Sequence, residues 1–495
     1  MRKAKSPLDV YMYLPPDSEK LFGKSKMAMA SDLVSRKVRL PEIKEAFLSQ
    51  NTPESERDFK TLEALLRPTI SEIQIGAGER TVTIGGDDVM FRHTLSFYNK
   101  TPIAVDVWDT MTDAALLERV EKIQSFRKFY VGRFLHPDMI AVRSVSNDPE
   151  TFGNCVRTIL KKCDLPLILC TKNPTVMRAG LLAAAGQHPL IYACDVRNRT
   201  EMAELALEFD APLVVCSNGN LDELKSLSAA LQEDGVTKLV LNPGAGCGDD
   251  EIGQTFLNFI RIRKAALDGD QDLAYPLIAL PIASWERMKS KCNSAIHAGQ
   301  NVVSKTDSVP IEDTFAEAAY FETMTAASLV VRYADILIIH GLLPYEMLPL
   351  LHVTEMIYTD PRTPASVEPK MYKIGNPTAE SPVLFTTNFA LTFYTVESDL
   401  SSSNVDCYLL SANTGGLGVE AAVAGGQLTA GVIKAGFDHA EFDWDATACK
   451  TLILPGLAAR LQNDIEKEMD ISTLVGPMDS GRLSKWLEEN WPPKK

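Results

Sequence analysis

Eight short apolar runs alternate with amphipathic segments through the middle of the chain. Runs that are apolar throughout are typical of strands buried on both faces, as in parallel sheets. Helical periods separate them, for example over 113–125, 200–209, 221–233 and 314–332. Eight regular units over roughly 240 residues fit a (β/α)8 barrel, which takes ~250, better than the alternative of an open doubly wound sheet. The runs lie at Ile103–Val107, Met139–Val142, Leu167–Cys170, Leu190–Cys194, Leu213–Cys216, Leu239–Leu241, Leu277–Leu280 and Ile336–Ile339.

Two smaller patterns precede these runs. Residues 1–60 are polar and weakly periodic apart from a helical segment over 28–38, which predicts a small N-terminal domain. Residues 72–84 alternate like two hairpin strands across a turn at 76–80, and such a hairpin could plug one end of a barrel. We therefore expect the barrel domain to span 61–358.

A proline-rich stretch follows the expected barrel. Five prolines in residues 359–382, with neither a helical nor a strand period, predict a semi-rigid linker. Residues 383–495 then repeat the strand–loop–helix pattern on a smaller scale, which predicts a Rossmann- or flavodoxin-like α/β domain. A polar loop with Ser401–Ser403 is expected between its first two strands. The four strands begin at Val383, Cys407, Thr451 and Thr473.

Polar and turn-forming residues end each of these four strands. In an open parallel sheet the carboxyl ends of the strands lie at one edge, which is where ligands bind. We therefore expect the four loops to converge on one crevice, although a glycine-rich turn after a strand does not by itself identify a ligand. The candidate binding residues are Thr386, Thr387 and Asn388; Asn413, Thr414, Gly415, Gly416 and Gly418; Pro455 and Gly456; and Gly476 and Pro477.

The expected βα loops of the barrel also carry polar residues just past the strand ends. Such positions are where barrels place functional groups, but they are equally the N-cap positions of the helices that follow. The segment 242–248 (NPGAGCG) could wrap a phosphate, yet it lacks the Lys and Ser/Thr of a nucleotide-binding P-loop. The loop residues include Asp106, Asp109, Arg143, Asn147, Lys172, Asp195, Arg197, Asn242 and His340.

Charge and composition indicate which partners and which cellular location to expect. A net charge of −15 argues against a nucleic-acid partner, which would need a basic footprint. No apolar core follows the basic N-terminal residues and no apolar run reaches the length of a membrane span, so we expect neither a signal peptide nor a membrane segment. The nine cysteines are scattered, without a CxxC pair, which suits the reduced thiols of a cytoplasmic protein.

The sequence lacks the motifs of several classes of enzyme and metal-binding protein. Neither GxSxG nor HExxH occurs, and the seven histidines are too far apart to suggest a metal site, so we assign no metal ligand and no catalytic residue. The motif Asp-x-His-x-x-Gly, by which one class of cobalamin proteins ligates cobalt, is also absent.

Three segments resemble one known family. Residues 62–107 (LEALLRPTISEIQIGAGERTVTIGGDDVMFRHTLSFYNKTPIAVDV) resemble its entry into a barrel, and residues 374–396 (IGNPTAESPVLFTTNFALTFYTV) the start of its corrinoid domain. The third is the tail, with LILPGLAARL at 452–461 and LVGPMDSGRL at 474–483. The family is the large (gamma) subunit of the corrinoid iron–sulfur protein of the acetyl-CoA synthase/CO dehydrogenase (Wood–Ljungdahl) pathway.

The resemblance implies a methyl carrier with an N-terminal iron–sulfur domain, a TIM barrel and a C-terminal corrinoid domain. In that family a corrinoid receives a methyl group from a methyltetrahydrofolate (or pterin) methyltransferase and delivers it to acetyl-CoA synthase. The resemblance also implies a heterodimer with a small TIM-barrel subunit, and a corrinoid held base-off with no histidine ligand, in agreement with the missing Asp-x-His-x-x-Gly motif.

This sequence departs from the family pattern in two places. Family members carry four cysteines near the N-terminus for a [4Fe-4S] cluster, whereas residues 10–40 contain none. Because thiolates hold such clusters, we expect no cluster here and a separate reductive activator in its place. The loop Asn413–Val419 also replaces a family pattern of Asp-Thr-Glu-Gly-x-Ser/Thr-Val, and so loses two acidic groups and a hydroxyl.

Two alternatives to the methyl carrier remain open on the sequence. One is an enzyme, a barrel methyltransferase that binds a methyl pterin in its own βα loops with residues such as Asp195 and Asn242. The other is a scaffold subunit that keeps the fold and has lost the cofactor.

Overall fold

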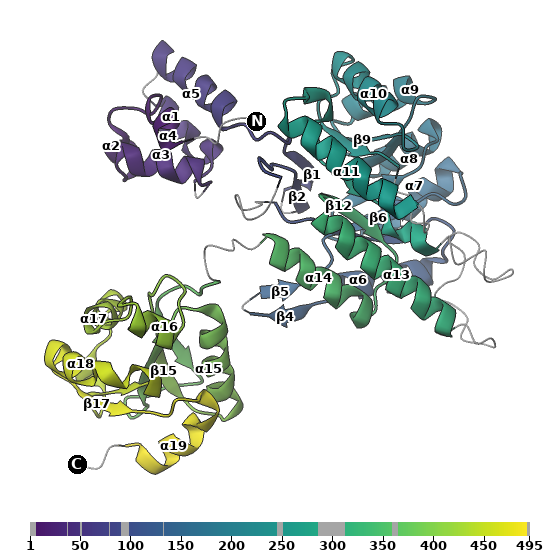
Figure 1. Ribbon diagram of the computed structural model, residues 1–495. Helices are drawn as coiled ribbons and strands as arrows, with labels where there is room; N and C mark the ends of the chain where they lie inside the picture. The colour runs from purple at the N-terminus through teal and green to yellow at the C-terminus, as the bar shows by residue number, and fades with distance from the viewer. Residues whose placement is uncertain are drawn as a thin grey trace. The chain divides into compact units, whose positions relative to one another are not determined.

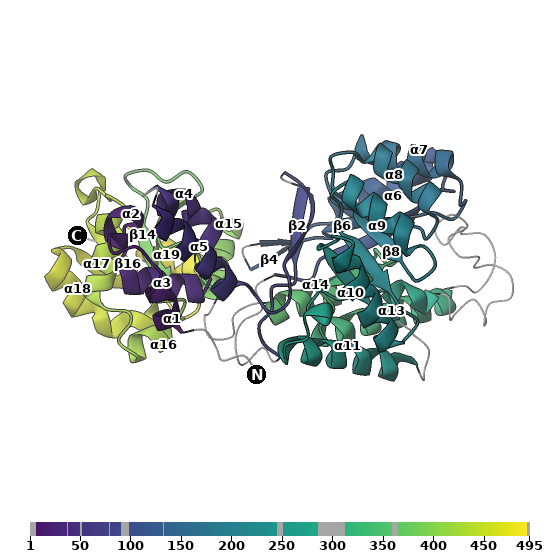
Figure 2. The same ribbon diagram turned by 90° about the horizontal axis from the view of Figure 1, so that it is seen from above.

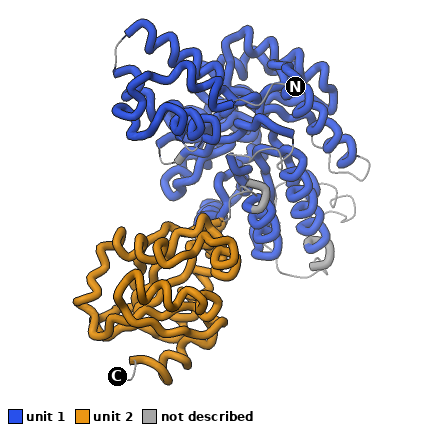
Figure 3. Tube along the Cα trace, turned by 60° about the vertical axis from the view of Figure 1, so that its left-hand side comes forward, with its two compact units in different colours: residues 1–126, 136–358 blue, residues 127–135, 359–495 orange. Residues whose placement is uncertain are grey.

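The computed structural model describes residues 6–36, 38–49, 52–78, 80–90, 99–131, 133–244, 251–285, 312–358 and 365–492. The chain forms two compact units, one of residues 1–126 and 136–358 and the other of residues 127–135 and 359–495 (Figure 3). No helix in the described ranges is both long enough and apolar enough to cross a membrane.

Short helices at the start of the first unit enclose an apolar core of their own. The Phe47 and Phe59 rings meet edge to face in it, with centroids 5.3 Å apart. The helix predicted over 28–38 begins and ends earlier, because the Ser25 hydroxyl caps it and Arg36 adopts a left-handed φ of 55°. Since Leu62 belongs to this core, the N-terminal domain extends past residue 60. The helices are α1 (Pro7–Tyr11), α2 (Ser18–Phe22), α3 (Lys26–Val34), the 3₁₀ turn η1 (Leu40–Ile43), α4 (Lys44–Leu48) and α5 (Pro53–Leu66).

A closed parallel barrel follows. Its strands pair in the order β10-β9-β8-β7-β6-β3-β12-β11, and a parallel bridge from Leu241 to Leu277 joins β10 to the segment that enters β11. The predicted (β/α)8 barrel is therefore confirmed, with every predicted run in a strand. The strands are β3 (Ile103–Trp108), β6 (Met139–Arg143), β7 (Leu167–Cys170), β8 (Leu190–Cys194), β9 (Leu213–Cys216), β10 (Leu239–Asn242), β11 (Ile278–Ala279) and β12 (Ile336–Ile339).

Helices surround the barrel strands on the outside (Figures 1 and 2). Alternate strand residues such as Ala104, Ile168 and Val214 face inward and fill the barrel with apolar side chains. The helices are α6 (Asp113–Ser125), α7 (Pro149–Leu160), α8 (Pro174–Ala183), α9 (Arg199–Glu208), α10 (Leu221–Glu233), α11 (Glu251–Leu267), α13 (Glu312–Val331) and α14 (Pro344–Tyr358), with 3₁₀ turns η2 (Gln271–Leu273) and η3 (Pro281–Ala283).

The predicted hairpin plugs the amino end of the barrel. Strands β1 (Ile73–Ala77) and β2 (Arg80–Ile84) pair antiparallel, and their isoleucines join the interior cluster. The Gly76 N–H donates to the carbonyl of His188, which precedes β8, so the plug lies at the end opposite the βα loops. Those loops remain available for ligands.

The second unit is a three-layer α/β domain. Its sheet order is β13-β15-β14-β16-β17, in which β13 alone runs antiparallel. The first parallel strand lies between the second and the third, which is the flavodoxin-like order. The elements are β13 (Met371–Ile374), β14 (Val383–Thr387), α15 (Ala390–Ser402), β15 (Cys407–Ala412), α16 (Val419–Ala424), α17 (Ala430–His439), η4 (Trp444–Ala446), β16 (Thr451–Leu454), η5 (Gly456–Leu461), α18 (Gln462–Met469), β17 (Ser472–Val475), η6 (Ser480–Arg482) and α19 (Leu483–Asn490).

Both faces of this sheet are buried, which explains its continuous apolar strands. Val383 and Leu452 face one core with Ile433 of α17 and Ile465 of α18. On the opposite face, Leu384, Leu409 and Ile453 meet a second core, formed with Phe393 of α15 and Leu487 of α19.

Three boundaries differ from those expected. The linker over 359–382 contains strand β13, which has a poor strand signal because its Tyr372 and Lys373 are only partly covered or exposed. Ser401 and Ser402 belong to the end of α15, so the loop there is shorter than predicted. A hairpin of β4 (Lys128–Tyr130) and β5 (Arg133–Leu135) falls within the expected barrel range but belongs to the second unit.

Candidate functional site

Asn388 joins the carboxyl ends of β14 and β15. Its side chain is 4% exposed, and its Oδ1 accepts the backbone N–H groups of Thr414 at 2.9 Å and Gly416 at 3.0 Å. The Asn388 N–H in turn donates to the carbonyl of Ala412 at 2.8 Å. The first two predicted loops therefore form one connected structure.

The turn after β15 depends on glycine. Gly415 and Gly416 have φ angles of 66° and 82°, in the left-handed region that side chains disfavour. The Thr414 hydroxyl donates to the Leu417 carbonyl at 2.8 Å and closes the turn, after which Gly418 is the N-cap residue of α16. The two glycines and the Thr414 hydroxyl together hold the shape of this turn.

The ends of β16 and β17 form the other half of the same edge. The Gly456 N–H donates to the Pro477 carbonyl at 3.0 Å, and the Gly476 N–H to the Leu454 carbonyl at 2.8 Å. A Cβ on Gly456 would lie 2.9 Å from the backbone nitrogen of Met478, so only glycine allows the two loops to approach this closely.

A cavity of about 310 Å³ opens at this edge, between α15 and the strand ends. Four of the candidate binding residues line it: Thr386, Pro455, Gly476 and Pro477. The rest of the lining is mostly apolar and was not predicted. It includes Leu391 and Met478, whose side chains are 56% and 73% exposed, and no sequence motif marks either residue as part of a site. The other predicted residues lie at the same edge but do not line the cavity: Thr387, Asn388, Asn413, Thr414, Gly415, Gly416, Gly418 and Gly456.

Three buried hydroxyls at this edge have no hydrogen-bond partner. They belong to Thr386, Thr387 and Ser411, which are 2%, 0% and 1% exposed. Thr386 and Ser411 are register partners across β14 and β15, on the face of the sheet that the cavity borders. A buried hydroxyl without a partner costs about 1–3 kcal/mol, which makes Thr386 and Ser411 candidate contacts for a ligand in the cavity, whereas Thr387 faces the other side of the sheet.

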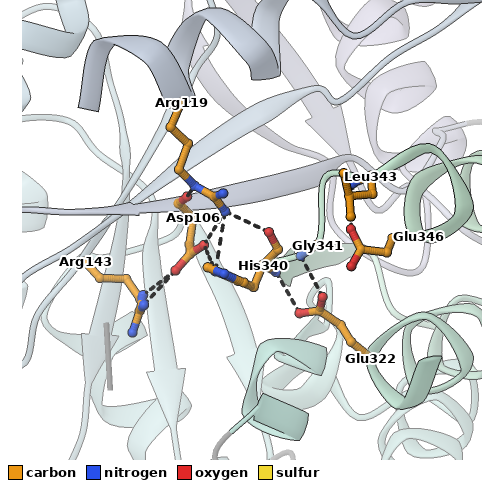
Figure 4. A network of polar contacts seen from close by, with 8 residues as sticks. All are labelled: Asp106, Arg119, Arg143, Glu322, His340, Gly341, Leu343 and Glu346. Atoms are coloured by element: carbon orange, nitrogen blue, oxygen red, sulfur yellow. Dashed lines mark hydrogen bonds and ion pairs between the residues drawn. The ribbon is translucent and has the colours of Figure 1, made fainter. Parts of the chain in front are cut away.

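The carboxyl end of the barrel holds a second group of charged residues. Asp106 is fully buried, and Arg119, Arg143 and His340 contact its carboxylate at 3.0, 2.8 and 2.7 Å (Figure 4). Burial alone would raise the pKa of Asp106, but its contacts with His340, Arg143 and Arg119 hold that pKa below its ordinary value. Burial lowers the pKa of His340, so at neutral pH the two guanidinium groups carry the compensating charge.

Glu322 extends this network. Its carboxylate accepts the backbone N–H groups of His340 and Gly341 at 2.7 and 2.8 Å (Figure 4). Burial raises its pKa to about 7. Gly341 has no room for a side chain, because a Cβ would lie 2.8 Å from the carboxyl carbon of Glu346. The groups of this network satisfy one another, which is the behaviour of a structural network.

The two barrel residues considered for a pterin are also engaged with neighbours. Asp195 accepts from Lys172 at 3.1 Å and from Arg197 at 2.7 Å. The Asn242 amide donates to the Tyr192 hydroxyl at 2.9 Å and accepts from the Gly244 N–H at 3.0 Å. Residues 245–250 of the candidate phosphate loop lie outside the described residues.

Fold and site together define a class: a (β/α)8 barrel protein with a second, flavodoxin-like domain whose parallel strand ends meet at one edge, beside a mostly apolar cavity. The family model described as "CO dehydrogenase/acetyl-CoA synthase delta subunit" matches residues 72–487. Subunit gamma 1 of the acetyl-CoA decarbonylase/synthase complex of Methanosarcina mazei is 46% identical, over 100% of both chains. Subunit gamma 2 of Methanosarcina thermophila is 48% identical, over 99% of this chain and 100% of its own.

The chain belongs to this family of acetyl-CoA decarbonylase/synthase gamma subunits. The resemblance seen in the sequence is confirmed at that level, and as a complex subunit the chain is expected to have partner subunits. Among solved structures, a dihydropteroate synthase of Xanthomonas albilineans is 16% identical, with a TM-score of 0.39, over 59% of this chain and 100% of its own.

Proposed function

We propose that the chain is a corrinoid-binding methyl carrier within this complex. The observation that carries the proposal is the cavity at the edge of the flavodoxin-like sheet, with the unpartnered hydroxyls of Thr386 and Ser411 beside it. An apolar cavity with a few hydroxyls suits a large, mostly apolar ligand that has polar substituents.

Different residues of the chain would contact different parts of such a ligand. The turn after β15, whose shape Asn388 fixes, would place backbone polar groups that Asn388 does not engage against the amide side chains of the corrin ring. The apolar lining would exclude water from the part of the ligand that enters the cavity, and Thr386 and Ser411 would donate to or accept from it. We propose that the corrinoid is held base-off and without a histidine ligand. When bound, a corrinoid supplies a cobalt centre that accepts a methyl group and passes it on.

The N-terminal domain does not fit a [4Fe-4S] cluster. The first cysteine of the chain is Cys155, and in the described part of the chain no group of three His, Cys, Asp or Glu side chains could hold a metal. An apolar core with Phe47 and Phe59 fills the domain instead. We propose that a separate reductive activator keeps the bound corrinoid active.

The proposed partners follow from this role. They are a small TIM-barrel subunit, a methyltetrahydrofolate or pterin methyltransferase as the methyl source, and acetyl-CoA synthase as the acceptor. The pterin-binding barrel is less well supported, because Asp195 and Asn242 already use their polar atoms on neighbours. A scaffold without cofactor would leave the buried hydroxyls of Thr386 and Ser411 unexplained.

Metal analysis tests the proposal directly. The full chain, purified anaerobically, is incubated with hydroxocobalamin and desalted, and cobalt and iron are measured together. We expect about one cobalt per chain, no stoichiometric iron and a corrinoid absorbance spectrum. A chain that retains no cobalt would be the cofactor-free scaffold, and one that retains methyl pterin without cobalt would be the barrel methyltransferase.

A further inference from the structure

A second cavity, of about 600 Å³, lies over the carboxyl ends of β6, β7 and β8 in the barrel unit. Every residue that lines it has a polar side chain: two are cationic, one is a carboxylate, and the others carry hydroxyl or amide groups. A flat aromatic ligand needs apolar or aromatic walls. This cavity therefore favours a small, strongly hydrated ligand.

The charges of the lining do not cancel. Lys172 and Arg197 both contact Asp195 Oδ2, at 3.1 and 2.7 Å, while the backbone N–H of Arg197 donates to Oδ1 at 2.9 Å. The hydrogen bond from Arg197, more than any other contact, holds the pKa of Asp195 well below its usual range, so the carboxylate is ionised. Two positive charges against one negative charge leave a surplus at the cavity.

Both cations keep donors for a ligand. The side chains of Lys172 and Arg197 are 45% and 77% exposed, and an ammonium group and a guanidinium group each have more N–H bonds than Asp195 accepts. The planar guanidinium group of Arg197 matches the geometry of phosphate and carboxylate groups, and the ammonium group of Lys172 adds a point charge.

The backbone adds to the same preference. Helix α9 begins without a side-chain cap, because the amide of its N-cap residue Asn198 is used elsewhere. Asn198 Oδ1 accepts from the Asp195 N–H at 2.7 Å, and Nδ2 donates to the Lys172 carbonyl at 2.8 Å. The first N–H groups of α9 therefore lack a side-chain acceptor, and their partial positive charge lies at the wall of the cavity, which Asn198 lines.

Nearby carboxylates do not reverse the surplus. Asp109 accepts hydrogen bonds from the Ser144 and Ser146 hydroxyls and from backbone N–H groups, none of which carries a charge. The single charge of Asp106 faces the two guanidinium groups of Arg119 and Arg143, and their excess of one positive charge offsets Asp109. We propose that this cavity binds a small oxyanion, the phosphate or carboxylate group of a metabolite, through Lys172 and Arg197. This proposal is independent of the corrinoid site.

Titration calorimetry of the full chain tests it, with inorganic phosphate and glutarate as separate probes. We expect saturable binding of at least one probe, weakened about tenfold or more in Lys172→Met and in Arg197→Gln. The stronger of the two probes tells whether the natural ligand is a phosphate or a carboxylate. The matched control is Arg178→Gln, since Arg178 is 47% exposed, pairs with Glu208 and is not part of the lining.

Two results would overturn the proposal. One is the absence of saturable heat with both probes while the chain is folded by circular dichroism. The other is binding that Lys172→Met and Arg197→Gln leave as strong as Arg178→Gln does. Because cobalt retention is measured separately, failure here is distinguishable from failure of the methyl-carrier proposal.

Discussion

The Oδ1 atom of Asn388 lies 2.9 Å from the backbone nitrogen of Thr414, and this contact ties the end of β14 to the glycine turn after β15. The two residues are far apart in the chain and meet only because β14 and β15 are neighbours in the sheet. The shape of the proposed corrinoid-binding turn is therefore set by a residue outside it.

Asn388→Ala should loosen that turn. It leaves the N–H groups of Thr414 and Gly416 without their acceptor, at a cost of about 1–3 kcal/mol for each buried donor. We expect hydroxocobalamin affinity, measured by absorbance titration, to fall about tenfold or more. Asn388→Asp keeps the acceptor and should retain most of the affinity. If both variants lost the same affinity for hydroxocobalamin, the hydrogen bonds from Thr414 and Gly416 to residue 388 would not be what supports binding.

Thr386→Val should separate ligand binding from stability. The variant removes a buried hydroxyl that has no partner in the free chain, so its thermal midpoint should be unchanged or higher. Cobalt retained after desalting should nevertheless fall. Ser411→Ala should behave alike, while Ser402→Ala, exposed at the end of α15, should change neither quantity. A stabilised Thr386→Val that keeps its full cobalt would remove this hydroxyl from the site.

Gly456→Ala should push apart the loops after β16 and β17, because the new Cβ meets backbone atoms of Met478 and Gly476 at 2.9 and 3.0 Å. We expect a loss of about 1–3 kcal/mol in the free energy of unfolding of this domain, from denaturant titration. Gly431→Ala is the control. It lies in α17, where its Cβ would meet the end of the Glu468 side chain at 3.3 Å and the Thr429 hydroxyl at 3.9 Å but no backbone atom, and alanine favours a helix.

The pH dependence of stability should report on Glu322. Burial raises its pKa to about 7 from an ordinary 4.5, so between these values the folded chain holds a proton that the unfolded chain has released. The free energy of unfolding therefore falls as pH rises through this window, by at most about 3 kcal/mol.

Glu322→Gln cannot titrate and loses part of the acceptor pair for His340 and Gly341. Its deficit in thermal midpoint should be largest near pH 5 and should shrink toward pH 8. The exposed Glu121→Gln is the control for pH effects elsewhere. A deficit that stays constant over this range would mean that Glu322 is ionised throughout.

Phe47→Ala should unfold or loosen the N-terminal domain. Phe47 is 1% exposed and packs against Phe59, and truncating a buried Phe costs about 3–5 kcal/mol. We expect faster hydrogen exchange over α3 to α5, whereas an iron chelator should leave exchange in the unmodified chain unchanged. Chelator-sensitive exchange would indicate a metal that this domain's own residues do not suggest.

The sequence predicted the barrel well because its strands are buried on both faces and so are apolar throughout. It failed at β13, where one side of the strand is partly exposed and prolines on both sides resemble a linker. A half-covered edge strand lacks the continuous run of apolar residues by which the buried strands were predicted.

The candidate site divides in the same way. Asn388 and the glycines stood out because turns and close backbone approach demand those residue types. Leu391 and Met478, by contrast, line the cavity only through the packing of α15 and the last loop, which sequence spacing does not encode. Ser411 could have been noticed as a hydroxyl inside an apolar strand.

The antiparallel strand β13 has a practical consequence for producing the second domain alone. It covers the outer edge of β15, whose N–H and carbonyl groups would otherwise be open to pairing with another molecule. A fragment that starts at Val383 would lose this cover and should self-associate in size-exclusion chromatography. One that starts at Ala365 keeps β13 and should self-associate less, although it too lacks the β4–β5 hairpin.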